Sequence, residues 1–121
     1  MKKILILEDD QVNQELLKLY LNDTFDTELV SSISEALALL NKNTYDIIIS
    51  DIHISDDSNK DGVDFLKAVR ANPKTANIPI LAYTAFNDPN DNNEIQFTGV
   101  ISKPITKQDF LKRVNSYLVK S

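Results

Sequence analysis

Polar residues that could bind metal or phosphate follow directly after four short apolar runs of the sequence. In chain order these polar ends are Glu8-Asp9-Asp10, Asp51, Thr84-Ala85 and Lys103-Pro104. Carboxylate oxygens bind hard cations, while a hydroxyl and an ammonium group can bind phosphoryl oxygens. The combination therefore indicates phosphate chemistry assisted by a metal ion.

The three acidic positions suit a magnesium site. If the runs at residues 4–7 and 47–50 are neighbouring strands, a strand spacing of ~4.8 Å brings Glu8, Asp9 and Asp51 together. Three such carboxylates would repel one another and raise their pKa values unless a cation lies among them. With no cysteine and a single histidine in the chain, the oxygen ligands favour Mg²⁺, which keeps water ligands that a phosphate can replace. We therefore expect a phosphoryl-transfer site.

Each of these residues also has an ordinary structural interpretation. Asp9 and Asp10 could form the N-cap of a helix, and Asp51 could cap a turn. Thr84 could be a strand-end hydroxyl, and most lysines such as Lys103 are solvated surface groups. Only their joint placement at four strand ends favours a functional site.

Strands are expected where short apolar runs are bounded by polar or turn-forming residues. These runs occupy residues 4–7, 28–30, 47–50, 78–83 and 100–102. The run Ile47–Ser50 is β-branched throughout its apolar part, which suits the centre of a sheet. Residues 28–30 form a weaker pattern that is more compatible with a sheet edge.

Apolar residues at helical spacing predict helices between these strands. The first helix runs to about residue 22 and is marked by Val12, Leu16, Leu19 and Tyr20. Ser32 and Glu35 form a capping box for the second helix, and Thr106 caps the last. The third stops near residue 72 because Pro73 follows. Residues 87–96 support only a short, poorly formed helix.

The alternation of strands and helices predicts an α/β fold. Five strand-helix units are too few for an eight-stranded barrel, and right-handed crossovers leave a doubly wound parallel sheet with helices on both faces. Such sheets bind ligands at the carboxyl ends of their strands. The polar residues described above all lie at that edge.

Composition excludes several other classes of protein. The 121 residues suit one domain spanning residues 1–121, and the absence of cysteine excludes disulfides and suits a reducing cytoplasm. A net charge of -5 without a basic run argues against direct nucleic-acid binding. The longest apolar runs are far shorter than the ~18 residues of a membrane span.

Four segments together resemble the receiver domain of bacterial two-component response regulators. In order, they are Ile4 to Asp10, Tyr45 to Asp51, Pro79 to Ala85 and Ile101 to Ile105. Each motif is weak alone, but the order and spacing of all four are specific. The resemblance implies a flavodoxin-like sheet with strand order 2-1-3-4-5. It also implies a signalling domain that assists its own phosphorylation and dephosphorylation, and that does not turn over a separate substrate.

The same resemblance assigns roles to the acidic residues. Asp51 would accept a phosphoryl group from a sensor histidine kinase or a histidine phosphotransfer protein. Asp9 would bind Mg²⁺ directly, Glu8 would bind it through water, and the backbone carbonyl of His53 would be a further ligand. The side chain of His53 is expected to be an exposed loop group without a catalytic role.

The resemblance also assigns the remaining polar strand ends to phosphate binding and switching. Thr84 would donate a hydrogen bond to a phosphoryl oxygen, with Ala85 beside it in the same segment. Lys103 would pair with Asp51 before transfer and with the phosphate afterwards. A downstream protein would then respond to the altered conformation.

The sequence departs from the family pattern on the surface that would report phosphorylation. Asp51 and Gly62 are eleven positions apart, which is longer than usual, and Ile54-Ser55 replaces the usual Met-Pro pair. The segment between residues 84 and 103 is shorter than usual. Val100 stands where many receivers carry Tyr or Phe.

Besides phosphoryl transfer, one alternative function stays open and two others conflict with the motifs. A receiver-like interaction module without phosphate regulation stays open because of these departures. A flavin-binding electron carrier needs a hydroxyl- and glycine-rich loop after the first strand, where this chain has acidic residues. A haloacid-dehalogenase-type phosphatase needs Asp-x-Asp, which Asp51-Ile52-His53 does not provide.

Overall fold

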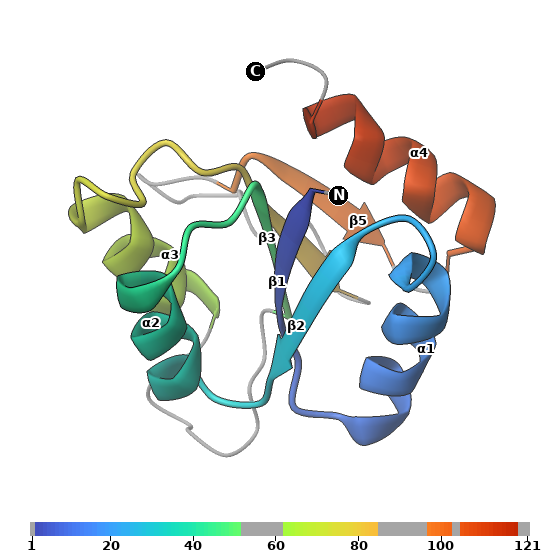
Figure 1. Cartoon of the computed structure of the whole chain (residues 1–121), viewed down its shortest axis with the longest axis horizontal. Coiled ribbons are helices and arrows are strands. Elements are labelled where there is room, and N and C mark those ends of the chain that lie inside the picture. The colour runs from blue at the N-terminus through green and yellow to red at the C-terminus, as the bar shows by residue number, and fades with distance from the viewer. Residues whose placement is uncertain (1, 52–61, 85–96, 103–104, 119–121) are drawn as a thin grey trace.

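The computed structural model describes residues 2–51, 62–84, 97–102 and 105–118. Its strands form one five-stranded parallel sheet in the order β2-β1-β3-β4-β5 (Figure 1), which confirms the predicted doubly wound fold. The strands are β1 Lys3–Leu7, β2 Asp26–Val30, β3 Ile47–Ser50, β4 Ile80–Thr84 and β5 Gly99–Ser102. The helices are α1 Gln11–Leu21, α2 Ile33–Lys42, α3 Gly62–Ala71 and α4 Lys107–Leu118.

The five predicted strands are all present, and their places in the sheet follow from their sequences. β3 is central and β2 lies at an edge, as their apolar content indicated. β4 begins at Ile80, two residues later than predicted. The reason is that the N–H of Ile78 donates to the carbonyl of Thr75 in a turn (3.1 Å), and Pro79 has no N–H to donate.

The first helix is confirmed, but most of the residues that marked it are not buried. Val12 and Leu19 are 73% and 72% exposed, whereas Leu17 and Leu21 are fully buried. α1 therefore carries apolar side chains on its solvent face as well as on its core face.

The predicted helix caps are present at α2 and α4. The Ser32 Oγ accepts the N–H of Glu35 (3.2 Å), and the Thr106 Oγ1 accepts the N–H of Asp109 (3.2 Å). α3 ends at Ala71, close to the predicted stop before Pro73. The weak helix expected at residues 87–96 lies outside the described residues.

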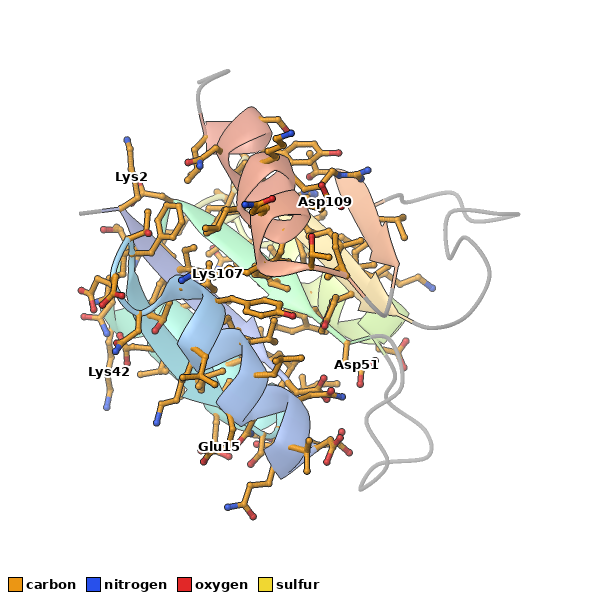
Figure 2. All side chains as sticks on the ribbon, turned by 90° about the vertical axis from the view of Figure 1, so that its right-hand side faces the viewer. Lys2, Glu15, Lys42, Asp51, Lys107 and Asp109 are labelled. Carbon is orange, nitrogen blue, oxygen red and sulfur yellow. The ribbon has the colours of Figure 1, made fainter. Side chains whose placement is uncertain are left out.

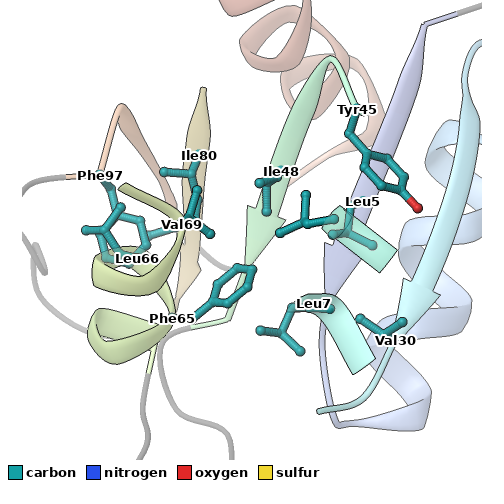
Figure 3. Packing of buried hydrophobic residues seen from close by; sticks show 13 residues of the cluster. Leu5, Leu7, Val30, Tyr45, Ile48, Phe65, Leu66, Val69, Ile80 and Phe97 are labelled. Carbon is teal, nitrogen blue, oxygen red and sulfur yellow. The ribbon is translucent and has the colours of Figure 1, made fainter. Parts of the chain in front are cut away.

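Helices cover both faces of the sheet, and each face has its own hydrophobic core. α2 and α3 cover one face, and α1 and α4 cover the other (Figure 1). Leu5 and Leu7 of β1 pack into the first core, shown in Figure 3, while Ile4 and Ile6 pack into the second. Burial on both faces explains why β1 and β3 are continuous apolar runs.

α4 packs closely against the edge strand β5. A Cβ atom at Gly99 would collide with the ring and hydroxyl of Tyr117, so glycine permits this close approach. The Arg113 guanidinium also donates to the carbonyl of Val100. Among the described helices, none combines the length and apolar character that crossing a membrane requires.

Candidate functional site

The register of the sheet brings the ends of β1 and β3 together. Leu7 lies opposite Ser50, and the parallel hydrogen bonding continues one residue further, because the N–H of Asp51 donates to the carbonyl of Leu7 (2.9 Å). On the other side of β1, the N–H of Glu8 donates to the carbonyl of Val30 (3.0 Å). Figure 2 shows Asp51 at the end of the sheet remote from Lys2.

The structure places Glu8, Asp9 and Asp51 in one cluster. Each offers a carboxylate oxygen, and these oxygens lie within 4.8 Å of one another. Glu8 is buried, with 1% of its surface exposed, whereas Asp9 and Asp51 are partly exposed. Glu8 therefore forms the buried inner end of the cluster, and Asp9 and Asp51 are the two carboxylates that solvent can reach.

Residues at the start of α1 hold Glu8, the buried member of the cluster, in place. A Glu8 carboxylate oxygen accepts the N–H of Asp10 (3.3 Å), and Asp10 in turn caps α1 by accepting the N–H of Val12 (3.3 Å). The Gln14 side-chain amide donates to the carbonyl of Glu8. The N-terminal end of α1, where the helix dipole is positive, consequently begins beside three negative groups.

The backbone of Asp51 is fixed from the preceding residue. Ser50 is fully buried at the end of β3, and its hydroxyl donates to the carbonyl of Asp51 (2.8 Å). The polar end of this strand thus orients the chain where the Asp51 side chain leaves the sheet.

Tyr83 is a further group beside the cluster that the sequence analysis did not single out. Burial raises the pKa of Tyr83 to about 12, with smaller contributions from Tyr20 and from the charges of Glu8 and Asp51. Its hydroxyl is therefore neutral at physiological pH. The sequence signal for Tyr83 was its position directly before Thr84. The signal for Gln14 was its position one helical turn after Asp10, which places it near the acidic strand end.

The remaining predicted site residues are only partly within the described structure. Thr84 is the last residue of β4, and its backbone pairs with Ser102 of β5, so both strands end at the edge that carries the acidic cluster. His53, Ala85 and Lys103 lie outside the described residues.

The donor set of the cluster suits a hard divalent cation. It consists of carboxylate oxygens alone, without histidine or cysteine. In the part of the chain that the structure describes, it is the one group of three or more such residues able to hold a metal ion. Oxygen-only sites of this kind favour Mg²⁺ or Ca²⁺ over transition metals that prefer nitrogen and sulfur.

A sequence model of the response regulator receiver domain matches residues 4–115. The chain belongs to this family. It is similar to the polar-differentiation response regulator DivK of Brucella ovis and of Brucella suis, each 31% identical over 97% of this chain and 96% of the relative. The resemblance to response regulators noted from the four motifs is thereby confirmed, and with it a phosphoacceptor signalling domain.

Solved structures show the same receiver fold. The chemotaxis protein CheY4 of Vibrio cholerae has a TM-score of 0.87 and 30% identity, covering 98% of this chain and 99% of that one. The receiver domain of the sensor histidine kinase PA1611 of Pseudomonas aeruginosa has a TM-score of 0.83 and 23% identity, covering 97% of both chains. The second similarity, at this lower identity, concerns the fold alone.

Proposed function

We propose that this receiver domain accepts a phosphoryl group onto Asp51 from the phosphohistidine of a sensor histidine kinase or a histidine phosphotransfer protein. The observation that carries the proposal is the cluster of Glu8, Asp9 and Asp51 at the carboxyl edge of the sheet. Asp51 directly follows the central strand β3 and is partly exposed to solvent. A phosphohistidine entering from outside can therefore meet it.

The metal in this proposal is Mg²⁺. Asp9 and Asp51 would hold it directly and Glu8 through water, with the backbone carbonyl of His53 as a further ligand. Bound Mg²⁺ would supply positive charge to the carboxylates and to the phosphoryl oxygens. In support, the PA1611 receiver domain was crystallised with a magnesium ion coordinated in its active site cleft.

The reaction is a transfer between a nitrogen and an oxygen atom. A carboxylate oxygen of Asp51 forms a bond to phosphorus while the bond from phosphorus to the donor's imidazole nitrogen breaks. That nitrogen keeps the electron pair and takes up a proton from water. The products are an acyl phosphate on Asp51 and a neutral histidine on the donor.

Positive charge and hydrogen-bond donors must meet the charge that spreads over the phosphoryl oxygens during transfer. Lys103 supplies an ammonium group that pairs with Asp51 before transfer and with the phosphoryl group afterwards. Thr84 supplies a hydroxyl donor, and Ala85 lies next to it in the chain. Contacts of this segment with the phosphoryl group bias the domain toward a second conformation, to which a downstream protein responds.

The solvent face of α1 suits the phosphodonor protein. Val12 and Leu19, seven residues apart and both largely exposed, lie on the same side of the helix, and Val12 follows Asp9 by only three residues. A protein that brings a phosphohistidine to Asp51 covers the surface next to the cluster. Burial of these apolar side chains would then stabilise the complex.

The domain assists its own phosphorylation and dephosphorylation and does not act on a separate substrate. We infer a cytoplasmic location, because a chain without cysteine needs no disulfide and so suits a reducing compartment. A second candidate function is an interaction module that phosphate does not regulate. The observation that favours this candidate is Val100 at the position where many receivers carry an aromatic switch residue.

The test is incubation with acetyl phosphate, with and without millimolar Mg²⁺, followed by intact mass measurement. We expect the wild-type chain to gain one phosphoryl group only with Mg²⁺, and the Asp51→Asn variant to gain none. Asp26→Asn, which changes an exposed carboxylate at the opposite end of the sheet, should behave as wild type. A wild-type chain that gains no mass would favour the interaction module.

A further inference from the structure

Tyr20 connects α1 to the segment between β5 and α4. Its hydroxyl donates a hydrogen bond to the backbone carbonyl of Ile105 (2.9 Å), which lies 85 residues further along the chain. Ile105 is two positions after Lys103 and directly before Thr106, the cap of α4. Figure 2 shows α1 and α4 together on this face of the sheet.

The Ile105 carbonyl stands between two elements that provide their own hydrogen bonds. β5 ends at Ser102. The first carbonyl that accepts a hydrogen bond from α4 is that of Thr106, which binds the N–H of Phe110 (2.9 Å). A buried or half-buried carbonyl outside such ladders needs a partner from elsewhere in the molecule. The Tyr20 hydroxyl provides that partner and so ties the segment to α1.

The hydroxyl of Tyr20 is held in place by packing. The Tyr20 ring lies 5.7 Å from the ring of Phe110, which is fully buried and lies 5.8 Å from the ring of Tyr83. Both pairs are tilted, at 49° and 55°, which is a favourable arrangement for aromatic rings. Three buried or half-buried rings from α1, α4 and β4 thus fix where the Ile105 carbonyl is bound.

We propose that Tyr20 is a positioning residue for Lys103, acting through the Ile105 backbone. A lysine ammonium sits on a flexible four-carbon stem, so its reach depends on where its backbone is anchored. In the sequence, only Pro104 separates Lys103 from the anchored Ile105. This inference rests on the proposed function, because Lys103 matters only if Asp51 is phosphorylated.

The first test measures the rate of phosphorylation by acetyl phosphate, with Mg²⁺ present, in two single variants and the double variant that combines them. Tyr20→Phe keeps the ring and loses the hydrogen bond, and we expect phosphorylation about fivefold slower, the effect of losing roughly one neutral hydrogen bond. Lys103→Ala should be slower still. The double variant should be no slower than Lys103→Ala alone, because the Tyr20 hydroxyl would act only through that lysine.

A matched control is Tyr45→Phe. The Tyr45 hydroxyl donates to Glu28 (2.7 Å), close to Lys3 and Asp46 where the strands begin, so this variant also removes a tyrosine hydroxyl that donates a hydrogen bond, here from a buried side chain. We expect its phosphorylation rate to equal that of the wild type. Mg²⁺ affinity should be unchanged in both tyrosine variants, since the three carboxylates are untouched.

Hydrogen exchange provides a readout that does not require phosphorylation. In Tyr20→Phe, the amides of Ile105 and Thr106 should exchange several-fold faster than in the wild type, with β1 and β3 unchanged. Unchanged exchange at these amides, an unchanged phosphorylation rate, or the same fivefold slowing when Lys103 is already alanine would each overturn the proposal. A wild-type chain that takes up no phosphoryl group would instead refute the proposed function, and the positioning role with it.

Discussion

Burial distinguishes the carboxylates at the sheet edge from one another. Glu8 has 1% of its surface exposed and accepts the N–H of Asp10, so a donor protein cannot reach it. Asp51 is partly exposed, and its backbone is held by hydrogen bonds to Leu7 and from Ser50. A nucleophilic side chain must be accessible to the phosphodonor, and its backbone must be held in a fixed position. Asp51 meets both conditions, which supports it as the phosphoacceptor.

At the residue scale, Lys103→Ala should slow phosphorylation by acetyl phosphate at least tenfold. The ammonium is expected to meet anionic oxygens as charge develops on them, and losing one such group from a preorganised site costs about 2 kcal/mol or more of transition-state stabilisation. The measurement is the initial rate of phosphorylation by intact mass. The domain should remain folded, because the core does not depend on a charged strand-end residue.

Lys107→Ala is the control for that variant. Lys107 is an exposed lysine in the first turn of α4, four residues away along the chain (Figure 2). Its removal changes the net charge by the same amount without removing the proposed phosphate ligand. Equal rates for Lys103→Ala and the wild type would contradict the assigned role of Lys103.

At the scale of the elements, α1 shows what sequence periodicity can and cannot decide. The helix itself was predictable, but it carries apolar residues around much of its circumference, so more than one face could have been the buried one. In the folded protein Leu17 and Leu21 are buried, and Val12 and Leu19 lie in solvent. Periodicity therefore locates a helix better than it chooses between two apolar faces.

That exposed face leads to a prediction about the phosphodonor. For a histidine-phosphorylated kinase or phosphotransfer protein that phosphorylates the wild-type chain, Leu19→Ser should weaken the reaction about tenfold, chiefly through KM. The reason is that burying a leucine side chain contributes roughly 1.5–3 kcal/mol. Phosphorylation by acetyl phosphate should be unchanged, because a small donor does not cover α1.

Lys18→Ser is the matched control on the same helix. Lys18 is exposed next to Leu19 but contributes no apolar side chain to that face. It should leave the KM for the protein donor within twofold of wild type, an estimate in line with the small effects of most surface substitutions. If Leu19→Ser and the wild type react equally with the protein donor, the donor does not use this face of α1.

At the scale of the whole molecule, the doubly wound sheet and the convergence of the acidic residues were predictable, because βα alternation leaves few topologies and strand ends share an edge. The strand order came from the resemblance to receiver domains. The hydrogen bonds from Gln14 to Glu8 and from Tyr20 to Ile105 were not predictable. They depend on how α1 is rotated and placed against segments distant in sequence, and the apolar residues on more than one face of α1 leave that rotation undecided.

The packing of Val100 indicates how the molecule would respond to phosphate. Its side chain lies against the first core, and its carbonyl accepts from Arg113. Valine has one χ angle and a strongly preferred rotamer, so it cannot swing as an aromatic switch residue does. We therefore predict that activation changes residues 85–98 and 55–61 and leaves the fifth strand unchanged.

Hydrogen exchange with and without beryllofluoride, an acyl phosphate mimic, measures this response. Protection should change in the two segments and stay constant across β5. Asp51→Asn treated in the same way serves as the control, since it lacks the carboxylate that the mimic requires. Altered protection confined to β5, with both segments unchanged, would contradict the predicted route.

The most direct test of phosphorylation at Asp51 is chemical trapping of the acyl phosphate. The chain is phosphorylated by a histidine-phosphorylated donor protein with Mg²⁺, then reduced with borohydride, which converts an aspartyl phosphate to homoserine. Peptide mass spectrometry locates that residue. We predict homoserine at position 51 and at no other acidic position, and homoserine at position 9 or elsewhere, with aspartate intact at position 51, would contradict the account.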